Sequence, residues 1–162
     1  MIVLYPKGAL MKKVLVIEDD VYIRESVKEL LEEEGFQVMC AANGKEALDS
    51  LNVESELPEL ILLDLMMPVM DGYDFCKIQE SDPRLSSLPV VLISADGQIE
   101  KKRARIGSRE VLKKPLSIDT ILSTVERFCG PAKSSNSTYT VSSKNSYGLN
   151  PNDVFSGTPT NL

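Results

Sequence analysis

Short apolar runs alternate with stretches of helical periodicity along most of this chain. The runs are too short for helices and rich in Val, Ile and Leu, and they cover residues 14–17, 36–40, 60–64, 89–93 and 110–113. Stretches with helical spacing or helix-capping residues cover residues 21–34, 44–51, 73–80, 98–105 and 118–128. The pattern therefore predicts five strands and five helices in alternation.

The predicted helices carry start and stop residues and one apolar face each. Asp20 and Asn43 stand where N-caps are expected, and Gly35 and Gly130 stand where helices should end. The apolar residues that form a stripe of helical period are Ile23, Val27, Leu30 and Leu31 in the first helix and Ile118, Ile121, Leu122, Val125 and Phe128 in the last. Each set repeats with the period of a helix that packs on one side.

Strands separated by helices need crossover connections, which are right-handed and produce a parallel sheet with helices on both faces. We predict such an α/β fold, a doubly wound parallel sheet of five strands, for residues 12–130. Residues 1–11 are predicted to be an N-terminal extension, because Met11 is a second potential start. Residues 131–162 are rich in Ser, Thr, Asn and Gly without amphipathic periodicity, which is typical of a disordered polar tail.

The composition limits the classes of protein that the chain can represent. Of its 162 residues, 43% are hydrophobic and 26% charged, which suits one globular domain. No apolar run approaches the roughly 18 residues of a membrane span. Three scattered cysteines, Cys40, Cys76 and Cys129, do not form a disulfide framework and indicate a reduced, cytoplasmic protein. The sequence has no histidine, so another molecule must supply any histidine chemistry.

Charge is unevenly distributed along the chain. Residues 11–82 contain 18 acidic and 6 basic side chains, which disfavours binding to nucleic acid because that depends on neutralising phosphates. Residues 83–130 contain 5 acidic and 9 basic side chains, concentrated in the basic run at residues 101–105 with Arg109 nearby. We interpret the basic run as a solvated helix face, with a docking surface for an acidic partner as the alternative.

Polar side chains stand at the ends of four predicted strands. Glu18 and Asp19 follow the first strand, Asp64 ends the third, Ser94 follows the fourth and Lys114 follows the fifth. The carboxyl ends of parallel strands share one edge, where ligands bind in such sheets, so these side chains should meet. Crowded carboxylates repel one another and lose solvation, which raises their pKa values; Lys114 and a divalent cation would relieve this. Ligands that are all oxygen favour Mg²⁺.

A carboxylate placed among cations is suited to phosphoryl transfer. The central carboxylate, Asp64, can act as the nucleophile and form an aspartyl phosphate. Mg²⁺ held by Glu18 and Asp19, together with Lys114, would neutralise the phosphoryl oxygens, while the Ser94 hydroxyl would donate a hydrogen bond to one of them. The residues thus predict a phosphoacceptor site.

These motifs resemble the receiver domain of two-component response regulators. The matching segments are VLVIEDD at 14–20, LILLDLMMPVMDG at 60–72, VVLISA at 90–95 and Lys114-Pro115. The resemblance covers residues 12–130 and implies the flavodoxin-like strand order 2-1-3-4-5. It also implies a phosphoacceptor protein that is not an enzyme beyond its own phosphorylation and slow dephosphorylation. We expect a stand-alone receiver, because residues 132–162 lack the pattern of a folded DNA-binding module.

The resemblance implies a role for each site residue. Asp64 would be the phosphoacceptor and a metal ligand, Asp19 a direct Mg²⁺ ligand and Glu18 a ligand through water. The backbone carbonyl of Met66 would supply another ligand. Lys114 would pair with the phosphoryl group or with Asp64.

Positions around the site both match the family pattern and depart from it. The Lys114–Pro115 bond is expected to be cis, and the small Ala95 leaves room for a phosphoryl donor. Val111 stands where a Tyr or Phe usually turns inward on phosphorylation, and the segment 94–107 is shorter than usual, which predicts a short fourth helix. We hypothesise that the fourth helix, fifth strand and fifth helix form an atypical partner surface that uses the basic run.

The resemblance implies partners of a definite chemistry. The donor would be a histidine kinase, a histidine phosphotransfer protein or a small phosphodonor such as acetyl phosphate, and a monomer or weak homodimer would act on a downstream protein. One alternative is a pseudo-receiver, an interaction module with an inactive acidic pocket. Another is a phosphatase with an Asp nucleophile, although Met66 stands where haloacid dehalogenases need a second Asp. Flavin binding is disfavoured because the loop after the first strand is acidic.

Overall fold

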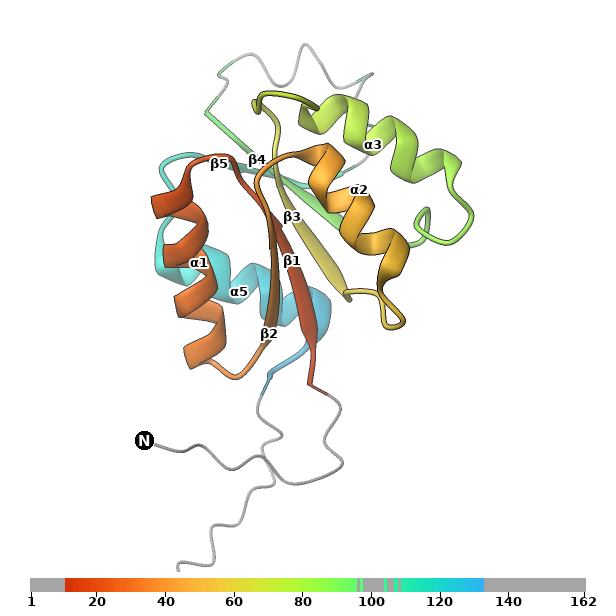
Figure 1. The fold of residues 1–162 in the computed structure, drawn as a ribbon. Coiled ribbons are helices and arrows are strands. Elements are labelled where there is room, and N and C mark those ends of the chain that lie inside the picture. The colour runs from red at the N-terminus through yellow and green to blue at the C-terminus, as the bar shows by residue number, and fades with distance from the viewer. Residues whose placement is uncertain (1–10, 96, 98–103, 105–106, 108, 133–162) are drawn as a thin grey trace, which may run out of the picture.

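The computed structural model describes residues 11–95, 97, 104, 107 and 109–132 (Figure 1). Five strands form one sheet: β1 (Lys13–Ile17), β2 (Gln37–Ala41), β3 (Leu60–Asp64), β4 (Val90–Ser94) and β5 (Val111–Lys113). Helices α1 (Val21–Glu33), α2 (Gly44–Val53), α3 (Gly72–Ser81) and α5 (Ile118–Cys129) pack against this sheet. The predicted fourth helix, the basic run and most of both predicted terminal segments lie outside the described residues.

The strands are all parallel and follow the order β2-β1-β3-β4-β5, which confirms the predicted fold class. In register, Asp64 lies opposite Ile93 and Ser94 lies opposite Lys113. Helices α1 and α5 cover one face of the sheet, and α2 and α3 cover the other (Figure 1). The carboxyl ends of the strands therefore form one edge of the sheet. The predicted site residues, which end or follow these strands, lie at this edge.

The three central strands, β1, β3 and β4, are buried on both faces because their successive residues point into two apolar layers, whereas the edge strands β2 and β5 are partly exposed. Residues that pack toward α2 and α3 include Leu15, Ile17, Ile61 and Leu63, and residues that pack toward α1 and α5 include Val14, Val16, Leu60 and Leu62. All of these side chains are at most 2% exposed. Burial on both sides explains why the strands appear in the sequence as continuous apolar runs.

The helix caps predicted at Asp20, Asn43 and Gly35 are confirmed, and Asp71 and Ser117 cap α3 and α5 in addition. Asp20 Oδ1 accepts hydrogen bonds from the backbone N–H groups of Tyr22 and Ile23, and Asn43 Oδ1 accepts one from Glu46. Gly35 follows α1 with a φ of +96°, a conformation that favours glycine. These contacts satisfy helix-terminal groups that would otherwise lack partners.

The apolar stripes of the first and last helices are only partly buried. Val27 and Val125 are buried, whereas Ile23, Ile118 and Phe128 are exposed. Ile23 and Ile118 line a groove between α1 and α5 instead of covering the sheet. In the described part of the chain, no helix is long and apolar enough to cross a membrane.

Candidate functional site

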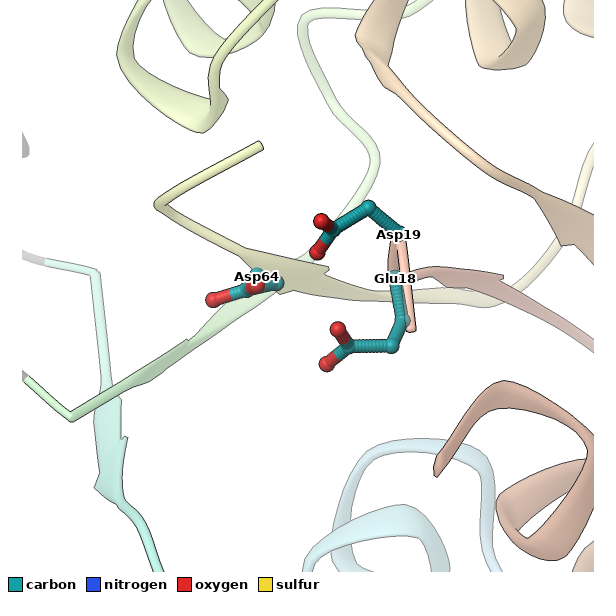
Figure 2. Close-up of side chains that lie close together, drawn as sticks. All are labelled: Glu18, Asp19 and Asp64. Atoms are coloured by element: carbon teal, nitrogen blue, oxygen red, sulfur yellow. The ribbon is translucent and has the colours of Figure 1, made fainter. Parts of the chain in front are cut away.

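Three carboxylates meet at the carboxyl ends of two neighbouring strands (Figure 2). Glu18 and Asp19 follow β1, and Asp64 is the last residue of β3. One carboxylate oxygen of each lies within 4.8 Å of the others. Glu18 and Asp64 are only 3% and 5% exposed, while Asp19 is exposed. The parallel pairing of β1 with β3 thus brings together residues that are far apart in the sequence.

The Lys114 side chain joins this acidic cluster from the end of β5. Its ammonium donates a hydrogen bond to Glu18 Oε2 at 3.0 Å and lies 3.6 Å from Asp64 Oδ2. The resemblance implied a pairing with Asp64; the structure adds a closer one with Glu18. One cation therefore faces two buried carboxylates.

Burial and mutual repulsion shift the ionisation of the cluster. Loss of solvation raises the pKa of Asp64 above its ordinary value, although the nearby Lys114 charge acts in the opposite direction. The pKa of Glu18 is raised for the same reason, with the charge of Asp64 adding to the effect. Desolvation lowers the pKa of Lys114, but its hydrogen bond to Glu18 and the charge of Asp64 outweigh this and raise it. The lysine is protonated at neutral pH, and the two carboxylates favour a further cation.

The other predicted site residues lie at the same edge of the sheet. Ser94 ends β4 and is 1% exposed, and its carbonyl accepts a hydrogen bond from the Lys114 backbone N–H at 2.9 Å. The Met66 backbone N–H donates to Asp64 Oδ1 at 3.4 Å, while its side chain is exposed. The Lys114–Pro115 bond is cis, as expected. The roles of the Ser94 hydroxyl and the Met66 carbonyl stay predictions.

The loop from β3 to α3 depends on close backbone packing. A Cβ atom on Gly72 would lie 2.7 Å from the Asp64 carbonyl oxygen and 2.8 Å from Leu65 Cα. Val69 has a φ of +70°, and the Met70 N–H donates to the Pro68 carbonyl across it, which makes a γ-turn. The phosphoacceptor candidate is therefore followed by a tightly constrained loop.

Two contacts of the acidic cluster were not anticipated from the sequence. The Asp20 backbone N–H donates to Glu18 Oε1 at 3.2 Å, so the residue that caps α1 also orients a site carboxylate. The Arg24 guanidinium donates to the Glu18 carbonyl at 2.6 Å and contacts the Asp19 carbonyl at 3.4 Å. The sequence did offer one indication of the Arg24 contacts. A basic residue near the start of a helix is unfavourable for the helix dipole, which suggests that Arg24 has a partner outside the helix.

The donor set fits a hard divalent cation. The three clustered side chains offer only carboxylate oxygens, and two of them are buried with raised pKa values. Mg²⁺ is commonly bound by one or two carboxylates and several waters, and the exposed side of Asp19 leaves access for these waters. The residues present are therefore compatible with magnesium.

Comparisons with known proteins agree on one family. The family model described as the response regulator receiver domain matches residues 14–126. The chain is 40% identical over 119 residues to the transcriptional regulatory protein CrdR of Helicobacter pylori, a match that covers 72% of this chain and 54% of CrdR. It is 35% identical over 116 residues to Protein PilG of Pseudomonas aeruginosa, covering 70% of this chain and 84% of PilG. The chain thus spans about half the length of CrdR and most of PilG.

A solved structure supports the same assignment at the level of the fold. The receiver domain of the Francisella response regulator 1452 is 35% identical and superposes with a TM-score of 0.64, covering 75% of this chain and 99% of that one. The residues that the family model matches contain all five strands except Lys13, the first residue of β1, and they include the acidic cluster at the edge of the sheet. The chain therefore belongs to the response regulator receiver domain family, whose members serve two-component signalling.

Proposed function

We propose that this chain is a phosphoacceptor whose Asp64 receives a phosphoryl group from a partner histidine kinase or histidine phosphotransfer protein. The observation that carries the proposal is the position of Asp64. It is a buried carboxylate at the centre of an acidic cluster, with the Lys114 ammonium 3.6 Å away. A nucleophile held between cationic groups is what phosphoryl transfer requires, because the protein mainly positions and neutralises the transferred group.

The proposed step forms one bond and breaks one. An Asp64 carboxylate oxygen attacks the phosphorus of a phosphohistidine on the partner, the P–N bond breaks, and the imidazole leaves with the electron pair. Lys114 can approach the new phosphoryl oxygens by moving away from Glu18, to which it is bonded in the unmodified chain. The Ser94 hydroxyl is proposed to donate to another phosphoryl oxygen. The sequence has no histidine, so the donor histidine is not among these residues.

Mg²⁺ is proposed as the cofactor of this step. Glu18, Asp19 and Asp64 would hold it, with the Met66 carbonyl as a further ligand. When bound, the ion would neutralise negative charge on the transferred phosphoryl group. Its binding would also stabilise the chain by relieving repulsion among the three carboxylates.

The surroundings of Asp64 suit contact with a partner protein. An apolar groove of about 770 Å³ runs between α1 and α5 and reaches Lys114 and Ala95 at the edge of the site. Exposed Tyr22, Ile23 and Ile118 contribute to its lining. Exposed apolar surface beside a reactive group is typical of an interaction site. We therefore propose that the phosphodonor protein rests on this groove while its histidine reaches Asp64.

The proposed output is contact with a downstream protein and not turnover of a substrate. The chain would act as a monomer or weak homodimer that neither binds nucleic acid nor enters a membrane. We propose the cytoplasm as its location, because Cys40, Cys76 and Cys129 are free thiols, which persist in a reducing compartment. The atypical partner surface that includes the basic run stays a hypothesis, tested by amide exchange on that face with and without a phosphoryl mimic.

Labelling with acetyl phosphate and Mg²⁺, followed by intact mass spectrometry, tests the proposed function. The natural chain should gain one phosphoryl group, and Asp64→Asn should gain none. Asp49→Asn removes an exposed carboxylate on α2 and should label normally. Label on Asp64→Asn would refute the assigned site. Turnover of the donor without label would favour the phosphatase, and neither label nor turnover would favour the pseudo-receiver.

A further inference from the structure

The loop between β1 and α1 carries two of the three clustered carboxylates, and Arg24 holds its backbone. The Arg24 guanidinium donates to the carbonyl of Glu18 at 2.6 Å and contacts the carbonyl of Asp19 at 3.4 Å. These carbonyls belong to the peptide groups on either side of the Asp19 Cα atom. Fixing both peptide planes fixes the direction in which the Asp19 side chain leaves the backbone.

Asp19 depends on this backbone support more than the other carboxylates do. Glu18 is held by Lys114 and by the Asp20 N–H, and Asp64 is held by the Met66 N–H and lies near Lys114. Among the residues that the structure describes, no hydrogen bond or ion pair is made by the Asp19 carboxylate. Its place in the cluster is therefore set by the loop conformation.

The position of Arg24 in α1 is unfavourable for the helix itself. It is the fourth residue of α1, close to the positive end of the helix dipole, and the first turn contains no acidic residue. Both contacts come from one guanidinium nitrogen, Nη1, whose N–H groups are held in the plane of the guanidinium, whereas the donors of a lysine ammonium rotate freely. A basic residue there contributes to the loop and not to helix stability.

We infer that Arg24 is a positioning residue for the magnesium site, acting through the peptide groups that flank Asp19. The inference rests on the proposed function, because it assigns a role within the same site. Residues that orient metal ligands without touching the metal typically change metal affinity by roughly 10- to 100-fold when they are removed. The same order of effect is expected for Arg24.

Calorimetric titration of Mg²⁺ into the full chain tests this inference, with folding of every variant checked by circular dichroism at the titration temperature. Arg24→Ala should raise the Mg²⁺ dissociation constant about tenfold or more. Arg24→Lys keeps the charge but loses the planar group that fixes the direction of the N–H donors, and it should weaken binding by less than Arg24→Ala does. The control is Lys28→Ala, which removes the next basic residue of α1, paired with Glu25, and should leave binding unchanged.

A dissociation constant of Arg24→Ala equal to that of the natural chain would overturn the inference, whatever its thermal stability. A merely structural role would lower the unfolding temperature without changing the affinity of the folded protein. If Arg24→Ala does not fold, Arg24→Lys decides: weaker binding supports the inference and unchanged binding overturns it. Failure of the natural chain to bind Mg²⁺ would instead refute the proposed metal site itself, and the inference with it.

Discussion

The Lys114 ammonium lies 3.0 Å from Glu18 Oε2, closer than its 3.6 Å distance to Asp64 Oδ2. The lysine is thus bonded to a proposed metal ligand and lies only near the proposed phosphoacceptor. The arrangement neutralises part of the acidic cluster in the unmodified chain. It also leaves Asp64, the proposed nucleophile, without a strong direct hydrogen bond to a cation.

Replacing this lysine should destabilise the chain in a pH-dependent manner. We expect Lys114→Gln to lower the free energy of unfolding by about 2 kcal/mol at pH 7, because a charged hydrogen-bond partner of buried Glu18 is lost. The loss should shrink at acidic pH, where Glu18 and Asp64 become protonated. Urea unfolding at pH 7 and pH 4 measures this. Lys113→Gln changes an exposed neighbour and should have little effect at either pH; equal losses for both variants would contradict the account.

Removing the charge of Asp64 should stabilise the metal-free protein at neutral pH. Burial raises the pKa of Asp64 above its ordinary value of 3.8, so the folded state favours the protonated form, and ionisation weakens the fold as the pH rises. In the presence of a chelator, Asp64→Asn should therefore have a free energy of unfolding about 1 kcal/mol higher than the natural chain at pH 7. This is the order of the Coulomb repulsion between carboxylates as close as those of the cluster. The gain should disappear as the pH falls through the raised pKa toward 3.8. A variant less stable than the natural chain at pH 7 would contradict this.

A side chain at Gly72 should disturb the acceptor. The Cβ of Gly72→Ala would lie 2.7 Å from the Asp64 carbonyl oxygen, so the backbone around Asp64 has to shift. We expect a loss of roughly 1–3 kcal/mol in unfolding free energy, typical of overpacking, together with slower labelling by acetyl phosphate. Gly97→Ala is a matched control, since its Cβ would meet nothing within 4 Å. Normal labelling and stability of Gly72→Ala would show that this close approach is not required.

At the γ-turn, replacing Val69 with glycine should stabilise the chain, in contrast to the substitution at Gly72. Val69 is 80% exposed with a φ of +70°, a conformation that costs an L-residue about 1–2 kcal/mol. Val69→Gly should raise the free energy of unfolding by up to about 1 kcal/mol, because relief of strain exceeds the entropy that glycine loses on folding. Val53 is similarly exposed, at 83%, but ends helix α2, so Val53→Gly should destabilise. Thermal unfolding of both variants compares them, and a loss of stability in both would argue against strain at Val69.

The fold and the strand-end residues could be predicted because each depends on a local sequence pattern. Apolar runs that end in Asp64 or Ser94 place these residues at one sheet edge once the strands are parallel. The caps at Asp20 and Asn43 follow from side chains that bond the next turn of backbone. These features need no knowledge of distant contacts beyond the parallel topology.

The remaining features depend on three-dimensional contacts that no local pattern encodes. Periodicity cannot tell whether Ile118 covers the sheet or a neighbouring helix, and it lies in the groove beside α1. The preference of Lys114 for Glu18 is set by distances across the sheet edge, between residues that are 96 positions apart. The backbone of Val69 has a conformation that valine does not favour, and it is bridged by the hydrogen bond from the Met70 N–H to the Pro68 carbonyl.

Locating the phosphoryl group within the chain tests the central claim most directly. The natural protein is labelled with acetyl phosphate and Mg²⁺, the acyl phosphate is reduced with borohydride to leave homoserine at the modified aspartate, and peptides are sequenced by mass spectrometry. The account predicts homoserine at Asp64 alone. Conversion at Asp19, a reduced glutamate at Glu18, or label at a residue outside this cluster would contradict it.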